Sequence, residues 1–263
     1  MIYPALSIVV RSFTDQYGNF TVQNVLDLNQ QIIRDSYWRT IQVSLLTALI
    51  GGIIGFGLAW AISLGKLPSW LRRAVLTFSG VGSNFAGIPL VFAFISAIGQ
   101  LGIVTTLLKN FGIFLYPGFN LYGFWGLVIV YTYFQIPLMT LTVLPALEGL
   151  RTEWQEAALN LGATRWQFWQ HVAFPILLPS ILGAMALLFA NAFGAHATAY
   201  ALIGGGGGAN MIVSIMVGNQ FSTDTFANPG LGNSLALGMI CVIAVNIIIY
   251  SYLRRLSERW QPR

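Results

Sequence analysis

The stretch TIQVSLLTALIGGIIGFGLAWAISL, residues 40–64, contains no charged side chain. A helix needs about 20 predominantly apolar residues to cross the hydrocarbon core of a bilayer, which is about 30 Å thick. Residues 40–64 are therefore long enough and apolar enough to form a membrane span.

The whole chain shares this apolar character. Of its 263 residues, 56% are hydrophobic and 8% are charged, whereas charged residues make up about 25% of a typical soluble domain. The mean hydropathy is +0.70. This composition excludes an ordinary soluble enzyme, a disordered chain and a fibrous protein. The 13 basic residues form no dense stripe, which disfavours a nucleic-acid binder.

Further uncharged stretches predict an all-α fold, a polytopic membrane helix bundle with five full spans in a single domain, 1–263. After the span at 40–64, we expect the others at about 74–98, 122–147, 177–203 and 233–253. The N-terminal stretch MIYPALSIVV is too short to cross a bilayer. It is either the end of a span whose start is missing from this chain or a short helix against the bundle.

The basic residues predict the orientation. Lys and Arg gather in the connections 65–73 and 148–171 and in the tail 254–263, which the positive-inside rule places in the cytoplasm. The connection 204–232 has no Lys or Arg and is predicted to be external. Residues 11–39 then lie outside, although three arginines in this segment count against that assignment.

The connection 148–171, EGLRTEWQEAALNLGATRWQFWQH, has more local structure than the others. Thr152-x-x-Gln155 and Thr164-x-x-Gln167 each have the spacing of a capping box, which opens a helix. Gly162 is placed to end the first helix in the left-handed conformation, and Pro175 is expected to end the second before the next span. The sequence thus predicts a helix–turn–helix at the cytoplasmic face.

Two interpretations of this loop are open. Its tryptophans fit an interfacial hairpin lying at the level of the lipid headgroups. Alternatively, the apolar face of the first helix fits a docking element that is presented to a groove on a partner protein.

One motif favours docking. Glu156-Ala157-Ala158-x-x-x-Gly162, followed after nine residues by Val172-x-Phe174-Pro175, resembles the signature loop of permease subunits of bacterial ATP-binding-cassette importers. The resemblance covers the chain from about residue 36 to the C-terminus. The glycine run 204–208, the turn 228–230 and the basic tail are similar to the branch that imports polyamines, aminophosphonates or ferric iron.

The resemblance implies a permease subunit in a bacterial cytoplasmic (inner) membrane, with its C-terminus in the cytoplasm and no chemistry or cofactor of its own. It implies a second permease subunit, two cytoplasmic ATPase subunits and an extracytoplasmic substrate-binding protein as partners, around a path for a small polar solute. The residues that it assigns to ATPase coupling are Glu153, Glu156, Ala157, Ala158, Gly162 and Pro175.

Polar side chains within the spans are candidates for lining that path, because polar groups at membrane depth avoid lipid. Each could equally bond neighbouring helices together. The candidates are Ser83, Asn84, Gln135, Asn191, His196 and Tyr200.

Other functions have less support. An ATPase-independent transporter or channel normally carries charged or ion-coupling residues in its spans, and these spans have almost none. A membrane-embedded enzyme or a metal site would need a cluster of His, Asp or Glu within the spans, which the sequence lacks. The run Gly204–Gly208 lacks the Lys-Ser/Thr of a phosphate-binding loop and is interpreted as an external turn.

Overall fold

The computed structural model describes residues 2–15, 18–65, 67–204, 211–221 and 228–258. Helices dominate these residues, and within them the sole β-type pairing is an isolated bridge between Thr14 and Phe20. The predicted all-α class is confirmed. The chain forms two compact units, each assembled from separate stretches: residues 1–46, 85–131 and 191–244 make the first unit, and residues 47–84, 132–190 and 245–263 make the second.

The first unit contains short helices and one end of each long helix. Its short elements are α1 (Ile2–Ser12), α2 (Gln23–Leu26), η1 (Asp27–Asn29), α5 (Ile88–Ile98), α6 (Ile103–Asn110), α11 (Ala197–Ile203) and α12 (Val213–Gln220). The long helices that also contribute residues to it are α3 (Gln31–Leu64), α7 (Phe124–Glu148), α10 (Phe174–Gly194) and α13 (Pro229–Glu258).

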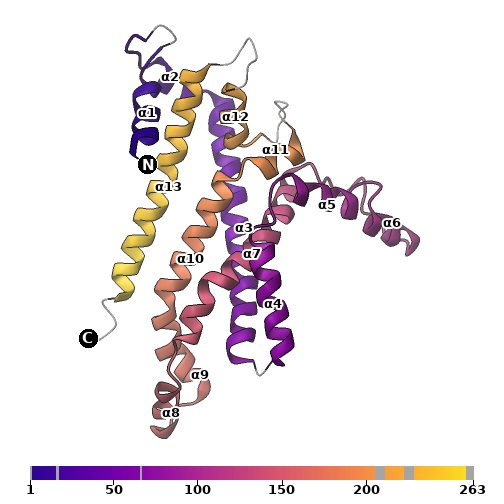
Figure 1. Ribbon diagram of the computed structural model, residues 1–263, viewed down its shortest axis with the longest axis vertical. Helices are drawn as coiled ribbons and strands as arrows, with labels where there is room; N and C mark the ends of the chain where they lie inside the picture. Colours follow the sequence, from indigo (N-terminus) through magenta and orange to yellow (C-terminus); the bar gives the residue numbers. More distant parts are fainter. Residues whose placement is uncertain (1, 16–17, 66, 205–210, 222–227, 259–263) are drawn as a thin grey trace. The chain divides into compact units, whose positions relative to one another are not determined.

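The N-terminal stretch forms α1, which lies beside the first turns of α13 (Figure 1). The Ser234 hydroxyl donates to the carbonyl of Ser12 at 3.2 Å, and the buried Asn24 amide donates to the carbonyl of Thr14 at 3.0 Å. These bonds hold the segment against the unit because they satisfy carbonyl groups near the end of α1. Within this chain, α1 is a helix of 11 residues that lies against the first unit.

The second unit contains α4 (Ser69–Gly82), α8 (Thr152–Asn160), α9 (Arg165–Phe168) and the π-helical segment η2 (Trp169–Ala173), with the remaining parts of the long helices. Glycines bring α3 close to α7 in this unit. A Cβ atom added at Gly51 would lie 2.5 Å from the Cβ of Gln135, and one added at Gly55 would lie 2.5 Å from the carbonyl oxygen of Ile136. The Thr140 hydroxyl donates to the carbonyl of Gly55 at 3.1 Å. Small residues four apart permit this close helix packing in membranes.

Five helical stretches of the described residues are long and apolar enough to cross a membrane: Gln31–Leu64, Ile88–Asn110, Phe124–Glu148, Arg165–Gly194 and Pro229–Arg255. The predicted number of spans is confirmed.

Two of the predicted boundaries are wrong. The expected span 74–98 is broken between α4 and α5, where Asn84 donates its side-chain amide to the carbonyl of Gly80 and Gly87 adopts φ +74°. A polar side chain that bonds the preceding turn competes with helix continuation, and glycine accepts the positive φ. The expected span 177–203 ends at Gly194, and α11 begins only after His196. The predicted glycine-rich turn lies, beyond Gly204, outside the described residues.

Candidate functional site

The helical loop between α7 and α10 begins with α8. Arg151 occupies the N-cap position with an extended backbone and without a side-chain cap, and Thr152 is the first helical residue. The predicted capping box at Thr152-x-x-Gln155 is therefore wrong, because a capping hydroxyl must lie one position before the helix. Glu153 lies in the first turn, where the positive end of the helix dipole favours a carboxylate.

The end of α8 is a complete Schellman motif. Gly162 has φ +84°, its N–H donates to the carbonyl of Leu159, and the N–H of Ala163 donates to the carbonyl of Ala158, both at 3.0 Å. This is the bonding pattern in which a left-handed glycine satisfies the last carbonyl groups of a helix. The predicted left-handed stop at Gly162 is confirmed.

The second helix of the loop opens as predicted. Thr164 and Gln167 form a reciprocal capping box, with the Gln167 side chain accepting from the Thr164 N–H at 2.7 Å. The expected end at Pro175 is wrong, because α9, η2 and α10 follow one another without a break from Arg165 to Gly194. In the π-helical turn the N–H of Phe174 bonds to the carbonyl of Trp169. Proline lacks an N–H, and Pro175 directly follows this widened turn.

α8 presents its side chains rather than burying them. No described residue of α8 is buried, and Leu161, directly after it, is 89% exposed. The Arg151 guanidinium lies 5.8 Å from the centre of the Trp154 ring, within the range of a cation–π contact. In the described part of the chain neither Glu153 nor Glu156 has an ion-pair partner. The helix thus offers two carboxylates and an apolar edge to whatever approaches it.

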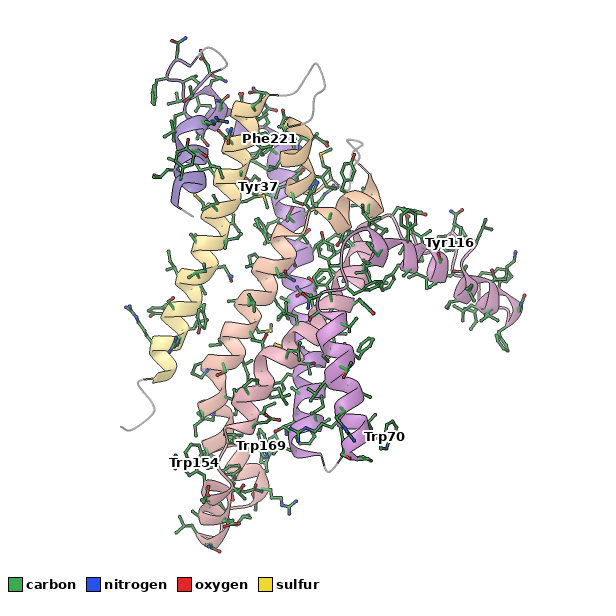
Figure 2. All side chains as sticks on the ribbon, in the orientation of Figure 1. Tyr37, Trp70, Tyr116, Trp154, Trp169 and Phe221 are labelled. Atoms are coloured by element: carbon green, nitrogen blue, oxygen red, sulfur yellow. The ribbon has the colours of Figure 1, made fainter. Side chains whose placement is uncertain are left out.

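Two contacts attach the stem of this loop to the rest of the second unit. Arg72 of α4 forms an ion pair with Glu148, the last residue of α7. Trp60 of α3 meets Trp169 of η2 edge to face, with ring centres 6.3 Å apart; Figure 2 shows Trp169 near the base of the loop that carries Trp154. Sequence reasoning missed both pairs because the partners lie far apart in the chain, and no local pattern identifies them.

The candidate path residues divide between the two units. Asn191, His196 and Tyr200 belong to the first unit. All three are exposed, and the Nδ1 atom of His196 lies 2.9 Å from the carbonyl oxygen of Ser214. The rings of His196 and Tyr200 lie 5.6 Å apart. His196 and Tyr200 therefore lie together at the start of α11.

The other three candidates belong to the second unit. Asn84 is exposed, and Ser83 is half-buried beside it. Gln135 is fully buried and donates to the carbonyl of Leu188 at 2.7 Å, while its side-chain oxygen has no hydrogen-bond partner. A buried amide that bonds a second helix matches the alternative interpretation of Gln135, as a bond between helices.

Among the described residues, no three His, Cys, Asp or Glu side chains lie close enough together to hold a metal ion. The arrangement combines apolar helices able to span a bilayer with an exposed, well-capped helical loop. Both features are typical of a multi-pass membrane protein.

Residues 36–262 match the family described as "Binding-protein-dependent transport system inner membrane component", and the chain belongs to that family. Membership confirms the resemblance to the permeases of ATP-binding-cassette importers.

Three comparisons illustrate the relationship. The thiamine transport system permease protein ThiP of Escherichia coli (strain K12) is 28% identical over 88% of this chain, which spans only 40% of ThiP. The spermidine/putrescine transport system permease protein PotB of Haemophilus influenzae is 25% identical over 98% of this chain and 90% of PotB. A crystal structure of a bacterial ABC transporter involved in the import of the acidic polysaccharide alginate has a chain with the same fold. Its TM-score is 0.73 at 16% identity, covering 100% of this chain and 91% of that one.

Proposed function

We propose that this chain forms one half of the translocation path of an ATP-driven importer, and that the loop 152–175 receives the motion of a cytoplasmic ATPase subunit. The observation that carries this proposal is the unburied α8, held by the Schellman motif at Gly162 and placed directly before the helix that runs into α10. A helix that served only the fold of this chain would bury its apolar edge against it.

The proposed ATPase-coupling surface consists of Glu153, Glu156, Ala157 and Ala158 on α8, with Gly162 at its end. The two alanines leave room for a close approach by another protein, and the unpaired carboxylates complement basic groups on it. Apolar contact with charge complementarity is the usual chemistry of a helix seated in a groove.

The helix that follows the loop gives the coupling a mechanical route. The turn at Gly162 joins α8 to Arg165, and residues from Arg165 to Gly194 form continuous helical structure. A displacement of α8 would therefore reach the base of α10 through this one hydrogen-bonded turn. Pro175 lies at that base. ATP binding and hydrolysis can drive transport only if two conformations of this element interact differently with the ATPase.

The solute is proposed to be small and polar, such as a polyamine or an aminophosphonate. Support comes from PotB, named for spermidine and putrescine, while ThiP is named for thiamine. The exposed polar groups Ser83, Asn84, Asn191, His196 and Tyr200 are the proposed lining of the path. Gln135 joins this set only if helix movement opens its buried site.

We further propose that residues 1–263 act as a single permease domain in a bacterial cytoplasmic membrane, with residues 148–171 and the C-terminus in the cytoplasm. The proposed partners are a second permease subunit, two ATPase subunits and an extracytoplasmic binding protein. ATP hydrolysis belongs to the ATPase subunits in this proposal, and this chain contributes no cofactor.

Purification of the tagged chain from its own membranes tests the proposal. We expect an ATPase to co-purify, and we expect the reconstituted complex to hydrolyse ATP faster when its substrate-loaded binding protein is added. Solute uptake by vesicles that contain this chain without any ATPase would refute the proposal and favour an ATPase-independent transporter or channel.

A further inference from the structure

A groove lies in the second unit between α3 and the helical stretch formed by α9, η2 and the start of α10. Its volume is about 530 Å³. We call it the tryptophan groove, and its lining residues are Phe56, Gly57, Trp60, Trp166, Trp169, Gln170 and Phe174. Apart from the indole N–H groups, Gln170 supplies the only polar side chain of this lining. The groove therefore suits an apolar occupant that needs no hydrogen bonds.

The groove lies near one end of a membrane span. Gly57 precedes the end of α3 at Leu64 by seven residues, which at 1.5 Å per residue is about 10 Å. Trp60 and Trp166 are 45% and 75% exposed, and tryptophan concentrates at the boundary between acyl chains and headgroups. The groove thus opens at the depth where a lipid acyl chain begins.

The size of the groove disfavours a protein helix as its occupant. A helix about 10 Å across occupies roughly 400 Å³ per turn, so the groove would take little more than one turn. Specific protein interfaces usually bury at least about 1,000 Å², which one turn cannot supply. This minimum interface area does not apply to a single flexible acyl chain, which can bind in a groove of this volume.

One basic residue next to the groove lining favours an anionic headgroup. Arg165 directly precedes the lining residue Trp166. In the part of the chain that the structure describes, Arg165 has no ion-pair partner. Arginine pairs readily with phosphate through its planar donors.

From these observations we propose that the tryptophan groove binds one acyl chain of an anionic phospholipid, with Arg165 meeting its headgroup. The lipid would join α3 to η2 and thereby stiffen the base of the loop helix. This binding does not depend on the proposed coupling to an ATPase, so the two proposals fail separately.

One glycine allows the groove to be filled from within. A Cβ atom added at Gly57 meets nothing within 4 Å, and the same is true of Gly80 on α4. Both glycines are exposed and helical. Gly57→Leu therefore places an apolar side chain in the groove without disturbing the fold, and Gly80→Leu is a matched control outside the groove.

The test uses phospholipids brominated on their acyl chains, which quench tryptophan emission on contact. The transporter is purified from membranes with its associated subunits and placed in nanodiscs of phosphatidylcholine that contain increasing fractions of brominated phosphatidylglycerol. We expect part of the emission to be quenched saturably at low mole fraction. The expected preference over brominated phosphatidylcholine is roughly fivefold, corresponding to about 1 kcal/mol for one arginine near an anionic surface.

The variants separate the two parts of the site. We expect Gly57→Leu to lose the saturable quenching, Gly80→Leu to keep it, and Arg165→Gln to keep it while losing the preference for phosphatidylglycerol. Quenching merely proportional to mole fraction in the wild type, or unchanged quenching in Gly57→Leu, would overturn the proposal. So would saturable quenching seen in the separated chain but lost in the assembled transporter, because a protein partner would then occupy the groove.

Discussion

Gly162 offers a direct test of the loop, because its conformation and its surroundings predict different effects for different side chains. Its φ of +84° is left-handed, yet a Cβ atom added there meets nothing within 4 Å. The cost of Gly162→Ala is therefore conformational rather than steric. The left-handed conformation costs an L-residue roughly 1–2 kcal/mol, which shifts the equilibrium away from the observed loop by a factor of about 5 to 30.

Asparagine supplies the matched comparison. It tolerates the left-handed conformation better than alanine does and is the common alternative to glycine at this helix position. If glycine is needed at position 162 for its left-handed backbone, binding-protein-stimulated ATP hydrolysis should fall in the order Gly, Asn, Ala. The loss in Gly162→Ala should be at most about 5- to 30-fold, the change in the conformational equilibrium. The amount of inserted chain, measured by immunoblot of membranes, should remain the same in all three.

Two results would refute this reasoning. Full stimulation in Gly162→Ala would show that the left-handed turn is not needed for coupling. A loss in Gly162→Asn equal to or greater than that in Gly162→Ala would show that an approaching partner excludes any side chain, so that space and not conformation selects glycine there.

Three further predictions concern the coupling surface, the orientation and the packing of α3. Ala158→Leu should release the ATPase during purification if α8 docks on it, whereas stronger membrane association with undiminished ATPase retention would support an interfacial hairpin instead. With Cys241 replaced, Glu153→Cys should react with a membrane-impermeant thiol reagent only after cells are opened; labelling of intact cells would reverse the orientation. Gly55→Ala should lower the thermal stability of the purified chain, because its Cβ atom would meet a backbone carbonyl of α7 at 2.5 Å. Gly57→Ala, with open space around it, should not, and equal losses in both variants would contradict the packing described.

Several features followed from the sequence alone because their causes are local or compositional. A helix that crosses a bilayer is long and apolar and satisfies its own backbone groups, so uncharged stretches such as 40–64 were enough to predict five spans and an all-α fold. The left-handed stop at Gly162 and the cap at Thr164 depend on residues within one turn of each other, and both were predicted. The Glu-Ala-Ala motif that begins at Glu156 indicated the family without any structural information.

Two local sequence patterns led to wrong predictions of where a helix begins or ends. Thr152-x-x-Gln155 has the spacing of a capping box, which would make Thr152 the N-cap residue. The helix instead begins at Thr152, one residue earlier than predicted, with Arg151 at the N-cap position. Pro175 is a common helix terminator, but the π-helical turn before it carries the helix through. In both cases the local pattern is compatible with more than one backbone arrangement, so the pattern alone does not fix where the helix begins or ends.

The features that only the tertiary structure decided join residues far apart in the chain. The ion pair of Arg72 with Glu148 spans 76 positions, and the contact of Trp60 with Trp169 joins two different helices. The periodicity of a sequence predicts which residues share one face of a helix. It does not predict which face of another helix packs against them. The tryptophan groove and the close approach at Gly55 exist because α3 meets α7 and η2 at particular points, and that meeting is fixed by the packing of the second unit as a whole.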